Sequence, residues 1–283
     1  MVFGCAFDEK LVARHIAIET QADLEKLQGS KYVQSNTKGV FQQAKTALDN
    51  GRYVLFSGTG CQVAGLKAFL GKDYEKLLTV DVVCHGVPSP ELFRRYLQWL
   101  SLRNNGQITD YSFRYKGKKG WGLFYKYTVG KKSKTGSGFF DPYYYSFLKC
   151  HNYRGGCYSC RYAGENRPSD ITLADFWSIK SQHKGFFDPK GNSAVIINSP
   201  KGEIYWDLVK EFFEYEESTY KKASVLNLNL IQPSPRPEVR DNFYKELDCD
   251  LEEYFGKKLK PPFQPKLRIK QMIPRWAKKL LGK

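Results

Sequence analysis

Short apolar runs alternate with helical patterns along the first third of the chain, and this rhythm constrains the fold more than any other feature. Strands that alternate with helices are joined by crossover connections, which place the strands side by side and parallel. The sequence therefore predicts an α/β fold with a mixed, mainly parallel sheet and flanking helices. The predicted strands are residues 2–7, 15–19, 53–58 and 77–86, and the predicted helices are residues 22–27, 39–51, 58–71 and 88–100.

The middle third of the chain changes character. Residues 108–117 and 122–130 alternate apolar and polar side chains around a segment rich in Gly and Lys. This alternation is typical of antiparallel strands, so we expect an inserted antiparallel β-unit. An aromatic stretch, FFDPYYYSFL, then leads into a Cys-rich loop, CHNYRGGCYSCRYAG. Further strands are predicted at residues 170–176 and 193–199, and further helices at residues 202–213 and 251–256.

The chain of 283 residues is 41% hydrophobic, which is enough to bury a substantial core. No stretch approaches the roughly 20 apolar residues that span a bilayer. The start, MVFGCAFDEK, lacks the basic and apolar regions of a signal peptide. We therefore expect a cytoplasmic protein.

The formal net charge of +16 is concentrated in a tail. Ten Lys or Arg residues and no acid lie between Lys257 and Lys283, so the remaining 256 residues carry only +6. We predict a domain over residues 1–256 and a basic amphipathic tail over 257–283. The tail is predicted to lie on an anionic membrane surface as a peripheral contact, or else to dock on its own protein. Nucleic-acid binding is not favoured, because the charge is terminal and the body carries no recognition module. The apolar face of the tail would consist of Ile269, Met272, Ile273, Trp276 and Leu280.

Seven cysteines in a cytoplasmic chain indicate metal binding or catalysis rather than a disulfide framework. Cys157 and Cys160, two residues apart in a Gly-rich loop, can direct two thiolates at one metal. Cys61 and Cys84 follow adjacent predicted strands, at the edge of an α/β sheet where ligands collect. These four cysteines would satisfy tetrahedral ligation of iron–sulfur or zinc, and Cys150 is an alternative fourth ligand.

Three further features near the cysteines are candidates for function. The turn SGTGCQ, between a strand and a helix, suits either a phosphate cradle or a tight turn capped by Ser57 or Thr59. His85 directly follows Cys84 and is a candidate proton donor, with a structural role as the alternative. Asp170 and Asp175 flank the strand ITLA and are candidates for a catalytic role, with the ordering of a turn by Ser169 or Asp170 as the alternative.

Several motifs together resemble the beta subunit family of coenzyme F420 hydrogenase/dehydrogenase, over nearly the whole chain up to about residue 200. They are FSGTGCQVAGLKAFLG, VDVVCHGVPSPELF, CYSCRYAG and SDITLADFW. The resemblance implies an iron–sulfur flavoprotein that passes electrons between a [4Fe-4S] cluster, FAD and a soluble redox partner. In the hydrogenase subunit that partner is a deazaflavin coenzyme. The resemblance also implies which residues bind the cofactors: Cys61, Cys84, Cys157 and Cys160 for the cluster, and Ser30, Lys31, Ser35, Ser57, Gly58, Thr59, Gly60 and Gln62 for FAD.

We therefore predict an oxidoreductase or electron-transfer subunit with His85 as its catalytic residue. Its partners would be a ferredoxin-like protein and a small-molecule or deazaflavin substrate. The alternative is a non-redox protein with a structural four-cysteine zinc site, associated with polysaccharide biosynthesis. Relatives usually carry a further Gly-rich segment upstream of a motif like VFGCAF, so part of the flavin pocket is expected to be missing or supplied by another protein.

Overall fold

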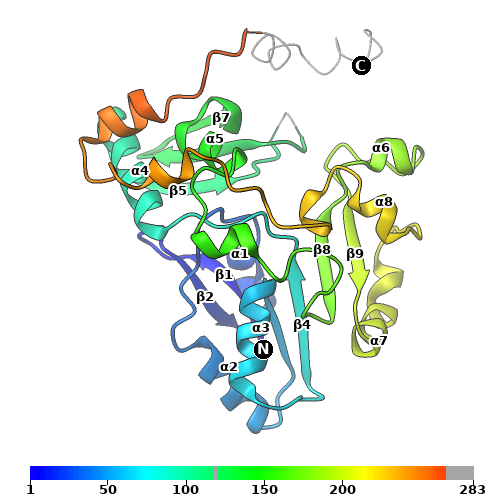
Figure 1. The fold of residues 1–283 in the computed structure, drawn as a ribbon. Helices are drawn as coiled ribbons and strands as arrows, with labels where there is room; N and C mark the ends of the chain where they lie inside the picture. Colours follow the sequence, from blue (N-terminus) through cyan, green and yellow to red (C-terminus); the bar gives the residue numbers. More distant parts are fainter. Residues whose placement is uncertain (118–119, 266–283) are drawn as a thin grey trace.

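A computed structural model of the protein describes residues 1–117 and 120–265 (Figure 1). Within these residues the strands form a six-stranded sheet, ordered β2-β1-β3-β4-β8-β9, and a three-stranded sheet, ordered β5-β6-β7. The large sheet consists of β1 (Val2–Phe7), β2 (Ala13–Ile18), β3 (Val54–Thr59), β4 (Leu77–Val82), β8 (Ile171–Asp175) and β9 (Ser193–Ile197).

Four parallel strands, β1, β3, β4 and β8, form the centre of the large sheet, and an antiparallel strand closes each edge. The register pairs Thr59 of β3 with Val82 of β4, so these two strands end side by side. Val82 in turn pairs with Leu173 of β8. The predicted mixed, mainly parallel sheet is confirmed. Its carboxyl edge brings together the chain segments that follow β3, β4 and β8.

Helices α2 (Val40–Asp49) and α3 (Gly60–Leu70) pack on one face of the large sheet, as Figure 1 shows. Their apolar side chains recur every three or four residues and pack against β1 and β3. Helix α3 ends where Gly71 takes the left-handed conformation, with φ of 69°. The buried core of this layer includes Phe3, Val40, Ala44, Phe56, Val63 and Leu66.

The predicted antiparallel unit is also confirmed, as the three-stranded sheet of β5 (Ile108–Phe113), β6 (Phe124–Val129) and β7 (Lys132–Ser137). Helices α4 (Pro90–Arg103) and α5 (Pro142–Leu148) pack against it around an aromatic core. Strand β7 was not predicted, because its first four residues are polar and exposed and give no alternation. The aromatic core includes Phe93, Tyr96, Tyr111, Phe113, Tyr143 and Tyr144.

Asp141 is a buried carboxylate at the centre of this aromatic core, with 3% of its surface exposed. Its Oδ1 accepts a hydrogen bond from the Tyr144 N–H at 2.8 Å and caps α5. Its Oδ2 accepts from the Tyr96 hydroxyl at 2.5 Å. Burial raises the pKa of Asp141 to about 6, although these hydrogen bonds favour the ionised form.

The remaining elements are short and lie mostly beside β8 and β9 or against the aromatic core. Tyr254 and Phe255 anchor the C-terminal part of the described chain in the aromatic core. Residues 269–280, which carry the predicted apolar face of the tail, lie outside the described residues, and the domain boundary at 256 stays a prediction. Among the described helices, none is both long and apolar enough to cross a membrane. The short elements are α1 (Leu24–Leu27), α6 (Ile179–Gln182), α7 (Pro200–Val209), α8 (Tyr220–Ser224), α9 (Arg240–Phe243), the 3-10 turns Gln21–Asp23, Gly138–Phe140, Gly155–Ser159, Lys210–Phe212 and Leu228–Leu230, and the π-helix Glu252–Lys258.

Candidate functional site

The four predicted ligands, called here the cysteine set, come from segments that meet at the carboxyl edge of the large sheet. Cys61 is the second residue of α3, directly after β3, and Cys84 lies two residues beyond β4. Cys157 lies within the 3-10 turn Gly155–Ser159 and Cys160 directly follows it. Because β3 and β4 are adjacent and parallel, the segments that carry Cys61 and Cys84 leave the sheet side by side.

The thiols of the cysteine set lie within electrostatic reach of one another. Burial raises the pKa of Cys84 to about 12, and the thiols of Cys157, Cys61 and Cys160 each raise it further. Burial also raises the pKa of Cys157, and the thiols of Cys61 and Cys160 add to that shift. Like charges raise the pKa of a thiol only when they are near, so the structure brings the predicted ligands together.

Backbone N–H groups point at two of these sulfur atoms. The N–H of Gly86 donates to the Cys84 thiol, and the N–H of the next residue, Val87, donates to the Cys157 thiol. The Val87 carbonyl in turn accepts from the Arg154 N–H at 3.0 Å. The segment after β4 therefore lies directly against the cysteine loop. Hydrogen bonds to thiolate sulfur are one of the ways in which proteins tune an iron–sulfur cluster.

Gly86 is the glycine that this arrangement requires. Its φ is 140°, a conformation that residues with a side chain rarely adopt. A Cβ built at Gly86 would lie 2.3 Å from Cδ2 of the Tyr153 ring, which is itself buried. By contrast, Gly155 and Gly156 in the cysteine loop have open space around the Cβ position. The position that requires glycine is therefore Gly86, in the segment after β4, and not Gly155 or Gly156 in the cysteine loop.

The chemistry of the cysteine set fits a metal that prefers thiolates, which includes both an iron–sulfur cluster and zinc. Within residues 1–117 and 120–265, however, no group of three or more His, Cys, Asp or Glu side chains stands close enough together to hold a metal ion as placed. Cys150 is not among the thiols that shift the pKa of Cys84 or Cys157.

The turn SGTGCQ is a capped helix start. Thr59 is the N-cap of α3, and its N–H donates to Oε1 of Gln62 at 3.0 Å. Nε2 of Gln62 donates to the Ser35 hydroxyl at 2.8 Å. His15 joins the same group, because its ring contacts Ser35 at 2.9 Å and the Ser57 carbonyl at 3.0 Å. Of the two caps considered from the sequence, Thr59 and not Ser57 occupies the position.

The glycines of this turn are closely surrounded at their Cβ positions. A Cβ at Gly58 would meet Gln62 at 3.1 Å, and a Cβ at Gly60 would meet Tyr162 at 3.0 Å. The ammonium of Lys31 is bonded to three backbone carbonyls of the α1 segment, the closest being Gln28 at 2.7 Å. Ser30 is exposed to solvent. FAD binding by these residues stays a prediction.

His85 is exposed at the edge of the cysteine set, yet protein surrounds it closely. Its pKa is lowered, first by the loss of solvation and also by the Arg114 guanidinium, while Asp175 opposes the shift. The guanidinium of Arg114 pairs with Asp175 at 3.0 Å and lies 4.8 Å from the ring centroid of Trp177. Trp121 stacks on Trp177 with 4.6 Å between centroids and donates to Asp175. Sequence analysis missed Arg114 and Trp121.

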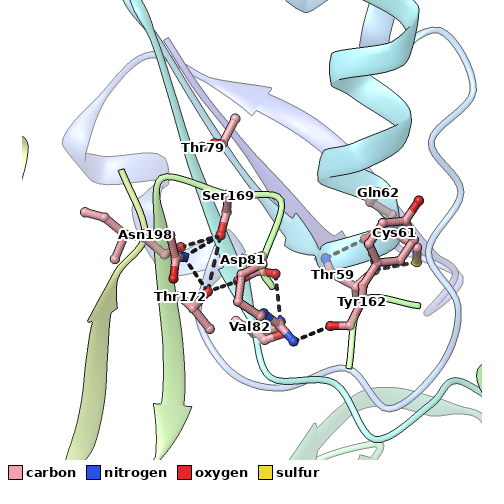
Figure 2. Close-up of polar contacts among 12 residues, drawn as sticks. Thr59, Cys61, Gln62, Thr79, Asp81, Val82, Tyr162, Ser169, Thr172 and Asn198 are labelled. Atoms are coloured by element: carbon pink, nitrogen blue, oxygen red, sulfur yellow. Dashed lines mark hydrogen bonds and ion pairs between the residues drawn. The ribbon is translucent and has the colours of Figure 1, made fainter. Parts of the chain in front are cut away.

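A second polar group, also missed, links β4 to the loop after Cys160 (Figure 2). Asp81, a fully buried residue of β4, pairs with Arg167 at 2.7 Å. An acid inside the otherwise apolar strand LLTVDVV is the signal that could have revealed this pair, because carboxylates are almost never buried without a partner. Asp170, which sequence analysis left open, is structural: it accepts hydrogen bonds from the Thr79 N–H and hydroxyl and from Ser199.

Comparison with known proteins agrees with the sequence resemblance. Residues 51–222 match the family described as the C terminus of the coenzyme F420 hydrogenase/dehydrogenase beta subunit. The fold is similar to a chain of the F420-reducing [NiFe] hydrogenase complex from Methanosarcina barkeri, studied as a xenon derivative. The TM-score is 0.50 at 12% identity, and the alignment covers 87% of this chain and 79% of that one. No curated protein matches the sequence. Because the family match covers more than half of the chain, this protein belongs to the coenzyme F420 hydrogenase/dehydrogenase beta-subunit family.

Proposed function

We propose that this protein is an oxidoreductase or electron-transfer subunit that binds one [4Fe-4S] cluster through the cysteine set. Membership of the family suggests a redox role, and the residues at the sheet edge give that role a location. The observation that carries the proposal is the mutual proximity of four thiols drawn from segments that are distant in the sequence. When bound, a cluster of this kind supplies single-electron transfer.

The residues around the cysteine set would keep it ready for a cluster. Cys84 is partly buried, so its thiolate requires a nearby positive charge, which a metal centre supplies. The N–H groups of Gly86 and Val87 stabilise negative charge on the sulfur atoms of Cys84 and Cys157. Cys61 is exposed, which would leave one side of the site open to a redox partner.

The electron partner would be a protein of the ferredoxin-like kind, and the structural neighbour comes from a hydrogenase complex. His85 is the candidate for exchanging a proton with a small-molecule or deazaflavin substrate, because it is exposed beside Cys84. The proposal assigns no step to a flavin.

Anaerobic purification followed by iron, sulfide, zinc and flavin analysis tests the proposal. We expect about four iron and four sulfide per chain in the wild type, and loss of nearly all of both in Cys157→Ser. Cys249→Ser is the matched control, because Cys249 is also partly buried but lies apart from the set, and it should keep its iron. Colourless wild-type protein with one zinc per chain and no iron would support the structural zinc alternative instead.

A further inference from the structure

We propose that Arg167, held in place by Asp81, is a positioning residue that fixes three of the segments carrying the cysteine set relative to one another. The inference deepens the proposed function and rests on its choice of ligands. The three segments are Gly60–Cys61 at the start of α3, Val82–Cys84 at the end of β4, and Cys160–Tyr162 after the cysteine loop.

The guanidinium of Arg167 contacts two of these segments directly. Its Nη2 donates to Oδ2 of Asp81 at 2.7 Å and to the Val82 carbonyl at 3.2 Å. Its Nη1 donates to the Tyr162 carbonyl at 2.5 Å. Figure 2 shows these bonds running from β4 to the loop that carries Tyr162. One side chain thus connects the backbone two residues before Cys84 with the backbone two residues after Cys160.

The third segment packs on the same ion pair. A Cβ at Gly60 would lie 3.0 Å from Oδ2 of Asp81 and 3.0 Å from Cβ of Tyr162. The first residue of α3 therefore sits against both Asp81 and the cysteine loop, with no room for a side chain between them. Cys61 directly follows Gly60 in the chain. The position of the Asp81–Arg167 ion pair therefore fixes the position of the Cys61 backbone.

Asp81 is itself held from the opposite side. Its Oδ1 accepts a hydrogen bond from the Thr172 hydroxyl at 2.5 Å, and Thr172 accepts from Asn198 at 2.9 Å. These residues lie on β8 and directly after β9, so the carboxylate is fixed by the large sheet (Figure 2). The guanidinium then transmits this fixed position to the cysteine loop.

The cost of burying this ion pair favours such a positioning role. The side chains of Arg167 and Asp81 are 2% and 0% exposed, and desolvation of two buried charges offsets much of their attraction. The planar fork of arginine can bond a carboxylate and two carbonyls at once, whereas the lysine ammonium is a point charge. If the ion pair serves to position the cysteine segments, its substitution should lower the affinity of the protein for metal.

The test uses Co²⁺ binding to metal-free protein, followed by the visible bands of tetrahedral cobalt thiolate. We expect Arg167→Gln and Asp81→Asn to weaken Co²⁺ binding by about 10- to 100-fold, as substitutions of residues that orient ligands generally do. We expect Arg167→Lys to recover only part of that loss, because it keeps the charge but not the fork. Circular dichroism and urea unfolding identify the conditions under which each variant is folded.

Asp170→Asn is the matched control. Asp170 is a buried carboxylate beside the same strands, but its bonds run to Thr79 and Ser199 and reach no ligand segment. Equal weakening in Asp170→Asn, or full affinity in Arg167→Gln, would overturn the positioning role, as would wild-type protein that binds no Co²⁺. A wild type that binds Co²⁺ tightly but contains no iron after anaerobic purification would refute the redox proposal and leave the positioning role intact.

Discussion

Replacing Gly86 with alanine is expected to lower the free energy of unfolding by about 3 kcal/mol or more and to reduce the metal content sharply. Two costs add: an L-residue at φ of 140° is strained, and the new Cβ would meet the buried Tyr153 ring at 2.3 Å. Each cost is typically ~1–3 kcal/mol. Relief of the clash requires movement of the segment that supplies N–H groups to Cys84 and Cys157.

Urea unfolding and metal analysis on Gly86→Ala and Gly155→Ala measure both effects. Gly155 lies in the cysteine loop, has no positive φ and has nothing within 4 Å of its Cβ position, so its substitution should change stability by only about 0.5 kcal/mol or less. If Gly86→Ala were as stable and as metal-rich as Gly155→Ala, the close packing of the segment after β4 against the cysteine loop would be contradicted.

Asp141→Asn should change how the stability of the protein depends on pH. Burial raises the pKa of Asp141 to about 6, whereas an unfolded chain titrates near 3.8. Between these values the folded protein holds a proton that the unfolded protein has lost, so this group makes the folded state less stable as the pH rises. The difference between these two pKa values corresponds to a change in the free energy of unfolding on the order of 3 kcal/mol.

Asparagine keeps the shape and can accept from the Tyr144 N–H while donating to the Tyr96 hydroxyl oxygen. The stability of Asp141→Asn relative to wild type should therefore increase between pH 4 and pH 7, measured by urea unfolding. Asp170→Asn should behave in the opposite sense. Burial opposes ionisation of Asp170, but hydrogen bonds from Thr79 and Ser199 prevail and lower its pKa, so its contribution is present at neutral pH and is lost in acid. A relative stability of Asp141→Asn that does not vary with pH would show that the carboxyl titrates normally.

The sequence allowed most of the fold to be predicted, because the periodicity of each element matches its burial. Strand β4 reads as an apolar run because most of its residues are buried at the centre of the large sheet, and α2 shows a clear apolar stripe. Strand β7 was missed, since it pairs with β6 through its backbone while its side chains remain polar. Backbone pairing at a sheet edge leaves little mark on the sequence.

The candidate site was predictable only in part. The spacing of Cys157 and Cys160 indicates a metal-binding pair. Cys61 and Cys84 follow adjacent strands, which places them near that pair. The mutual effects of the four thiols on their pKa values agree with this placement. The role of Arg167 was not predictable, because 86 positions separate it from Asp81 and an arginine in a polar loop usually remains solvated. The filling of the SGTG turn depends on His15 and Tyr162, which also come from distant segments.

The order of the proposed ligands along the chain has a consequence for when the site can form. Cys61 and Cys84 belong to neighbouring β–α units that can form locally. Residues 85–156, which include the whole three-stranded sheet, must fold before Cys157 reaches these two cysteines. Closing so long a loop is slow and entropically costly. Metal uptake would therefore be among the last events of maturation. Any substitution that delays assembly of the aromatic core would yield protein deficient in metal, even with all four cysteines intact.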